Sequence, residues 1–212
     1  MKWNHLLPCC LPLVFFMLVT CDGNNSNVDI SVTRSIDSVV DLDGWVRSDG
    51  DASWDRGGPL TGDFDSSYPG LGYRQFYSFD ISIISPGNEI EEAFVHLYQA
   101  NYSGDPYAEL GSVIVDHVDY GDSLTSDDYD SAALEENIGT LSDNLILEYK
   151  TLDVTTYVRT DYTAARQYSQ FRLRFSVADG NDDGGNDYVN FTDYEDSCCG
   201  VNMPPYLEVT YR

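Results

Sequence analysis

A short acidic segment near the C-terminal end has the residue types and the spacing that bind a hard cation. It reads DGNDDGGND from residue 179, with oxygen-bearing side chains at its first, third, fifth and ninth positions. The pattern matches the first half of a calcium-binding loop, in which alternate Asp and Asn oxygens surround the ion and a glycine permits the sharp turn. The predicted ligands are the side chains of Asp179, Asn181, Asp183 and Asp187 and the backbone carbonyl of Gly185.

This loop differs from an EF-hand at its end. Asn190 stands at the twelfth position, where an EF-hand carries a bidentate Glu, and the flanking residues predict strands instead of helices. We therefore predict an EF-like loop inside a β-hairpin, with calcium in a structural role. The alternative is an acidic hairpin turn without a metal.

A second set of residues has the chemistry that recognises polysaccharides. Aromatic rings stack on sugar faces, and a row of arginines can hold a uronate carboxylate through paired hydrogen bonds. The aromatic candidates are Trp45, Trp54, Tyr68, Tyr73, Tyr98, Tyr102 and Tyr107, and the arginine candidates are Arg74, Arg172 and Arg174. The alternative is that the tyrosines are half-buried fillers and the arginines pair with acids on neighbouring strands.

The sequence contains one motif that is typical of a hydrolase. Residues 121–124 read GDSL, as in lipases whose serine is activated by a histidine that follows an aspartate three residues earlier. Outside the N-terminal segment the histidines are His96 and His117, which both precede Ser123 and lack such an aspartate. A serine without a base is not an activated nucleophile. We therefore predict no catalytic residues and no enzyme activity.

Strands must position these side chains, because alternation with a period of two dominates the sequence. Runs at residues 73–84, 93–98, 171–177 and 207–211 alternate in this way, and the first places Tyr77, Phe79, Ile81 and Ile83 on one face. Segments rich in Gly, Asp, Asn and Ser separate the runs, as turns require. We predict about nine or ten antiparallel strands in a jelly-roll-like β-sandwich, a single all-β domain over residues 30–212. Residues 126–134 and 156–165 are expected to give a helical turn or two.

Six motifs follow one another along the chain. They are DGWV at 43–46, YRQFYSFDIS at 73–82, IEEAFVHLY at 90–98, LDVTTYVR at 152–159, FRLRF at 171–175 and PYLEVTY at 205–211. In this order they resemble the DNRLRE-domain family of secreted bacterial proteins. The resemblance implies a β-sandwich that accompanies exported hydrolases and surface proteins. Related modules are classed as carbohydrate-binding, including modules attached to alginate-degrading enzymes.

The charge excludes several classes of partner. The chain has 36 Asp and Glu against 11 Lys and Arg, a formal net charge of −25. Nucleic-acid binding needs a basic footprint, and anionic lipid repels an acidic domain, so neither partner is expected. The same charge disfavours polyanions such as alginate. Aromatic residues make up 13% of the chain, which separates it from disordered acidic proteins.

The N-terminal segment has the features of an export signal. Lys2 precedes an apolar stretch at residues 6–19 that is short for a membrane span, so residues 1–20 predict a signal peptide. The residues before Cys21 resemble a lipobox, which predicts lipidation of this cysteine and a polar tether at residues 21–29. Ordinary cleavage nearby is the alternative. Cys198 and Cys199 are adjacent and form either a vicinal disulfide or two separate thiols.

Together these features predict an exported, lipid-anchored protein of the cell envelope or outer surface, or a secreted one. The expected activity is non-catalytic binding of a polysaccharide or cell-surface glycan, with calcium as the cofactor and contact with the membrane only through the lipid anchor. The alternative is a structural or adhesive envelope or matrix protein that acts through protein–protein contacts.

Overall fold

The computed structural model describes residues 30–53, 60–194 and 200–212. Its twelve strands are β1 (Val32–Asp37), β2 (Gly44–Arg47), β3 (Ala52–Ser53), β4 (Thr61–Asp63), β5 (Gly72–Asp80), β6 (Ile90–Ser103), β7 (Val113–Val118), β8 (Glu135–Ser142), β9 (Tyr149–Asp153), β10 (Tyr168–Phe175), β11 (Tyr188–Phe191) and β12 (Tyr206–Tyr211). The helices are α1 (Pro106–Glu109), α2 (Thr155–Thr163) and the 3₁₀ turns η1 (Ile81–Ile83) and η2 (Ser126–Asp128). The predicted signal peptide, the whole predicted tether with Cys21, and Cys198 and Cys199 lie outside the described residues.

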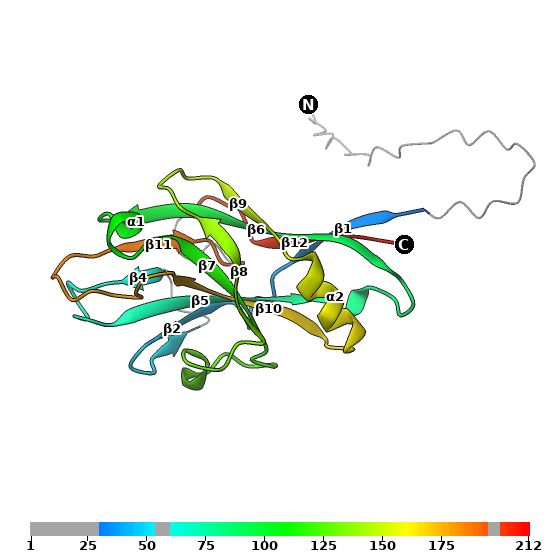
Figure 1. The fold of residues 1–212 in the computed structure, drawn as a ribbon, viewed down its shortest axis with the longest axis horizontal. Coiled ribbons are helices and arrows are strands. Elements are labelled where there is room, and N and C mark those ends of the chain that lie inside the picture. Colours follow the sequence, from blue (N-terminus) through cyan, green and yellow to red (C-terminus); the bar gives the residue numbers. More distant parts are fainter. Residues whose placement is uncertain (1–29, 54–59, 195–199) are drawn as a thin grey trace, which may run out of the picture.

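The strands form one antiparallel sheet. Its order is β1-β12-β6-β11-β4-β5-β10-β7-β8, with β9 paired to β6 and the β2–β3 hairpin paired to β5. Strand β6 is long enough to pair with β12 and β9 along its first part and with β11 near its end. The sheet folds over along this path, so that β9, β6 and β12 form a layer above β5 and β10 (Figure 1).

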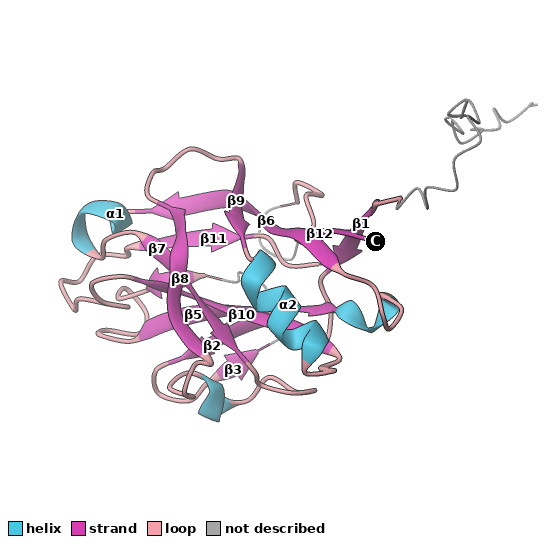
Figure 2. Cartoon of the chain, turned by 45° about the vertical axis from the view of Figure 1, so that its right-hand side comes forward, coloured by secondary structure: helices cyan, strands magenta, loops and turns pink. Residues whose placement is uncertain are grey.

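The main core lies between these two layers. Val95 and Leu97 of β6, Phe171 and Leu173 of β10 and Leu207 of β12 are fully buried and belong to one apolar cluster. Each such side chain contributes about 1.5–3 kcal/mol of hydrophobic stabilisation relative to an exposed one. Helix α2 packs against both β6 and β10 and so closes one end of the core (Figure 2).

A second apolar cluster lies on the outer face of β5. It includes Phe76 of β5, Val46 of β2, and Tyr120 and Tyr129 from the connection between β7 and β8. Phe76 and its neighbour Tyr77 are both buried although they point to opposite faces of the strand. The expectation of one apolar face is therefore wrong for β5, because the β7–β8 connection covers its other face.

The run predicted at residues 73–84 ends earlier than its pattern suggests. Asp80 accepts hydrogen bonds from the backbone N–H and the hydroxyl of Ser82, which turns the chain into η1. Ile81 stays in the core, but Ile83 is 49% exposed. The hydrogen bonds from Ser82 to the Asp80 side chain thus favour a turn over continuation of the strand.

The mostly-β, antiparallel, single-domain prediction is confirmed, whereas the strand count is higher than predicted. The short strands β3 and β4 and the polar strand β8 were missed, because β8 reads EENIGTLS and buries only its last two residues. Turn η2 lies within the predicted segment 126–134, and α2 begins one residue before the predicted segment 156–165. No helix in the described residues is long and apolar enough to cross a membrane.

Candidate functional site

Four aromatic side chains form a continuous row on the outer face of β6, β9 and β12. We call Tyr98, His96, Tyr206 and Tyr149 the aromatic row. Side chains of the three strands point alternately to the inner and to the outer side of the layer. The four side chains of the row point to the outer side and are half-buried. The register places Tyr98 opposite Tyr149 and His96 opposite Tyr206.

The rings contact one another from strand to strand. The imidazole of His96 stacks on Tyr206 with a centroid distance of 4.4 Å and an interplanar angle of 11°. Tyr149 meets Tyr206 edge-on at 5.6 Å and Tyr98 edge-on at 5.2 Å. Such pairs stabilise each other by about 0.5–1.5 kcal/mol beyond the area they bury. The contacts therefore hold the four rings as a preformed surface.

Hydrogen bonds fix two of these rings further. Tyr149 donates its hydroxyl to the carbonyl of Pro204 at 3.1 Å, and a 3.0 Å hydrogen bond joins His96 Nδ1 to the hydroxyl of Thr151. His96 Nε2 is buried and has no hydrogen-bond partner. Burial lowers the pKa of His96 from its ordinary value, although the Glu208 carboxylate opposes the shift. The imidazole is therefore neutral at pH 7 and acts as a flat ring.

In the described part of the chain, no helix packs on the outer side of the row. Helix α1 lies at one end of the layer and α2 between the layers, so neither covers the outer face of β9, β6 and β12 (Figure 1). The β8–β9 connection borders the row and exposes Ile146 by 59% and Leu147 by 46%. The arrangement provides an aromatic surface with one stacked pair and two edge-on contacts, next to an apolar rim.

Sequence reasoning identified only part of this surface. Tyr98 is among the aromatic candidates, but Tyr149 and Tyr206 are not, and nothing in the sequence alone shows that β9 and β12 flank β6. The signal that was present is the alternation of β6 and β12, which places His96 and Tyr206 away from the core.

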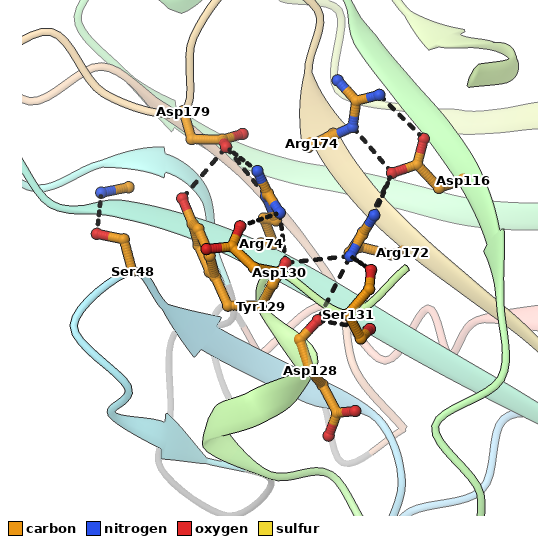
Figure 3. A network of polar contacts seen from close by, with 11 residues as sticks. Ser48, Arg74, Asp116, Asp128, Tyr129, Asp130, Ser131, Arg172, Arg174 and Asp179 are labelled. Atoms are coloured by element: carbon orange, nitrogen blue, oxygen red, sulfur yellow. Dashed lines mark hydrogen bonds and ion pairs between the residues drawn. The ribbon is translucent and has the colours of Figure 1, made fainter. Parts of the chain in front are cut away.

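The predicted arginine row is present but paired with acids. Arg172 and Arg174 of β10 both bind Asp116 of β7, with the shortest contacts at 2.9 Å and 2.8 Å (Figure 3). Arg74 of β5 binds Asp179 at 2.7 Å. The guanidinium groups are thus neutralised by carboxylates of this chain, which is the alternative that the sequence left open.

The same arginines fix the β7–β8 connection to the sheet. Arg172 donates to the carbonyls of Asp128, Tyr129 and Ser131 at 3.4, 3.0 and 2.8 Å, and Arg74 donates to the carbonyl of Tyr129 (Figure 3). Burial alone would lower the pKa of Arg74, but Asp179 more than offsets this and raises it. These arginines therefore have a structural role in the described fold.

Two of the predicted aromatic sites are buried, whereas Tyr68 and Tyr102 are exposed. Trp45 is 9% exposed and Tyr73 is 4% exposed, and their rings pack edge-on at 5.2 Å. Tyr73 also accepts a hydrogen bond from Arg47, whose guanidinium lies 4.0 Å from the ring centroid of Tyr68. Trp54 lies outside the described residues. Trp45 and Tyr73 therefore do not offer a ring face to a sugar.

The acidic loop brings three of its five predicted calcium ligands near one another, the side chains of Asn181, Asp183 and Asp187. A Cβ placed on Gly185 would lie 2.9 Å from Asp183 Oδ1 and 3.4 Å from Asp187 Oδ2, so these two carboxylates converge on Gly185. The amide of Asn181 lies 3.4 Å from Asp183 Oδ2. Asp179 is directed away, with its Oδ2 bound to Arg74 and to the hydroxyl of Tyr129.

Two buried carboxylates outside the motif hold this loop. Asp63 accepts the backbone N–H groups of Asn181 and Asp187, and Asp65 accepts that of Gly184. Burial raises the pKa of Asp63. The neighbouring carboxylates of Asp65 and Asp187 raise it further, whereas the two backbone hydrogen bonds lower it. Within the described residues, no group of three or more Asp, Glu, His or Cys side chains has the geometry of a metal site. The loop therefore fits a calcium site only in part, because the side chain of Asp179 is bound elsewhere.

The residues weighed for catalysis occupy separate places. Ser123 is exposed in the β7–β8 connection. His117 is buried and binds Asp161 at 2.9 Å, and Asp161 also accepts hydrogen bonds from Ser169 and Arg166. Ser169 is directed to the carboxylate, so this buried cluster does not have the order of a Ser-His-Asp triad.

The comparisons with known proteins add no relatives. No protein-family model matches the chain. No curated protein matches it either. The resemblance to the DNRLRE-domain family therefore stays a prediction from the six motifs.

Proposed function

We propose that this protein is an exported surface module, anchored by a lipid on Cys21, that binds a polysaccharide through the aromatic row and performs no catalysis. The observation that supports this proposal is the row itself, in which three ring contacts hold three tyrosines and a neutral imidazole on a sheet face that no described helix covers. Aromatic faces fixed in advance bind with little loss of conformational entropy. We also assign the folded-over sheet to the jelly-roll type.

The test is retention of the purified protein on a panel of neutral, amino and uronic polysaccharides. We expect retention on at least one member, with a dissociation constant that rises about tenfold in Tyr98→Ala and in Tyr206→Ala, the scale of one lost aromatic contact. Tyr68→Ala is the matched control, because Tyr68 is also an exposed tyrosine but lies in the β4–β5 connection. Circular dichroism verifies that each variant is folded. Equal retention of all three variants would contradict the assignment of the row.

A structural envelope or matrix protein is the second candidate. Ile146 and Leu147, exposed at the rim of the row, favour this function because apolar side chains on a protein surface often mark protein contacts. Absence of retention on every polysaccharide, together with self-association that Ile146→Ser abolishes, would favour it over glycan binding.

We propose in addition that the acidic loop binds a structural calcium ion through Asn181, Asp183, Gly185 and Asp187, without Asp179. When bound, the ion would offset the repulsion among the carboxylates of Asp63, Asp65 and Asp187. A site at a hundredfold excess of calcium over its dissociation constant adds about 2.7 kcal/mol of stability.

Thermal unfolding in calcium and in EDTA tests this site. For a domain of this size the gain corresponds to about 5–10 °C in melting temperature. The shift should disappear in Asp183→Ala and persist in Asp122→Ala, which removes an exposed acid from another loop. Identical melting of the wild-type protein in calcium and in EDTA would show that the loop is held by hydrogen bonds alone.

A further inference from the structure

The charged strand residues on the sheet face around the aromatic row are acidic. By register, Asp153 of β9 and Glu208 of β12 lie on either side of Phe94 of β6. The Asp153 carboxylate accepts two hydrogen bonds from Thr155 and is influenced by Arg159, so Glu208 is the acid that remains available there. One step along the sheet, Asp37 of β1 lies opposite Tyr206. Adjacent strands are about 4.8 Å apart, so these carboxylates lie within one or two strand spacings of an aromatic ring.

No strand position on this face carries a compensating cation. Arg34 of β1 pairs with Val209, and Lys150 of β9 pairs with Leu97, so both basic residues belong to the opposite side of their strands. Lys150 is buried and binds Glu148 and Asn144. Glu208 forms no ion pair with a basic residue in the described part of the chain, and its carboxylate acts on His96 and Tyr206.

Aromatic rings beside carboxylates favour positively charged sugars and disfavour negatively charged ones. An ammonium group is attracted both to the face of an aromatic ring and to a carboxylate, whereas a uronate is repelled by the same carboxylates. A neutral sugar gains only the stacking contact. The uncompensated acids are therefore complementary to a sugar that carries a positive charge.

We propose that the aromatic row and the carboxylates of Asp37 and Glu208 bind a polysaccharide of amino sugars with free ammonium groups. The inference rests on the proposed glycan-binding function and specifies its substrate class. The sugar rings stack on the tyrosines of the row, and the ammonium groups lie between Phe94 or Tyr206 and the adjacent carboxylates.

Calorimetric titration with soluble oligomers of equal length tests this proposal. The probes are a glucosamine oligomer, its N-acetylated form, a neutral glucan oligomer and an oligouronate. We expect the glucosamine oligomer to bind about tenfold more tightly than the N-acetylated form, and the oligouronate not to bind. Equal affinity for the glucosamine and N-acetylated forms, with both lost in Tyr98→Ala, would overturn the inference and leave the proposed function standing. If none of the four oligomers bound, both the inference and the proposed glycan-binding function would be contradicted.

Matched variants separate a specific site from bulk attraction to an acidic protein. Glu208→Gln combined with Asp37→Asn removes two charges from the face, and Asp122→Asn combined with Glu135→Gln removes two from exposed positions elsewhere. The preference for the glucosamine oligomer should fall about tenfold in the first pair and persist in the second. A loss of the same size in both pairs would show that net charge alone attracts the oligomer, and would overturn the assignment to this face.

Discussion

Replacing Asp116 by alanine is expected to lower the free energy of unfolding by about 3–5 kcal/mol, the cost of leaving buried charges without their partner. Asp116 is fully buried and accepts hydrogen bonds from Arg172, Arg174 and the backbone N–H of Asn137. Its removal leaves Arg172, which is 4% exposed, facing only carbonyl groups. Urea unfolding of the two proteins measures the difference.

A control variant separates burial from charge. Asp130 also pairs with an arginine, at 3.3 Å from Arg74, but its side chain is 85% exposed. Exposed ion pairs contribute at most about 1 kcal/mol, so Asp130→Ala should unfold almost as the wild type does. Equal losses in Asp116→Ala and Asp130→Ala would contradict the structural role of the buried pairing.

The contribution of Asp116 should also depend on pH. Burial alone would raise its pKa, but the hydrogen bonds from Arg174, Asn137 and Arg172 outweigh burial and lower it. A carboxyl group with a lowered pKa in the fold stabilises above its unfolded pKa and loses that contribution as the pH falls through its folded pKa. The stability difference between the wild type and Asp116→Asn should therefore shrink below about pH 4.

The second large effect is expected from Gly62→Ala, with a loss of about 3 kcal/mol or more. Gly62 has φ of +120°, and a Cβ there would lie 2.2 Å from the carbonyl oxygen of Asp187 and 2.8 Å from Tyr188 Cα. Both contacts are with backbone, so relief requires β4 and β11 to separate. Thermal and urea unfolding report this loss.

Gly87→Ala is the matched control for Gly62→Ala. Gly87 also has a positive φ, of +94°, but nothing lies within 4 Å of a Cβ placed on it. Gly87→Ala should lower the free energy of unfolding only by the conformational strain of the positive φ, about 1 kcal/mol. If Gly62→Ala were no more destabilising than Gly87→Ala, the close approach of the two strands would not matter to stability.

The sequence predicted the strands with strong alternation and missed those without it. The predicted runs at residues 93–98, 171–177 and 207–211 correspond to β6, β10 and β12. Strand β8 is mostly polar and exposed, so neither burial nor period marks it. The jelly-roll prediction required knowledge of which strands pair, and pairing depends on contacts between residues far apart in the sequence, such as Tyr206 with His96.

The candidate sites depended even more on tertiary packing. The alternation of β10 correctly put Arg172 and Arg174 on one face, but only the fold shows that the β7–β8 connection covers Arg172. Trp45 and Tyr73 are predicted candidates for stacking on a sugar, but their rings pack against each other. Asp63 and Asp65 were not predicted to hold the acidic loop, because more than a hundred residues separate them from it.

The length of β6 has a thermodynamic consequence for any ligand of the aromatic row. This strand supplies His96 and Tyr98 to the row, Val95 and Leu97 to the core, and its last residues to the pairing with β11. Neither layer can therefore unfold without breaking a strand that the other layer uses, which favours cooperative unfolding of the whole domain. Ligand binding on the outer face is consequently linked to the stability of the entire molecule, including the distant acidic loop, through the continuity of one strand.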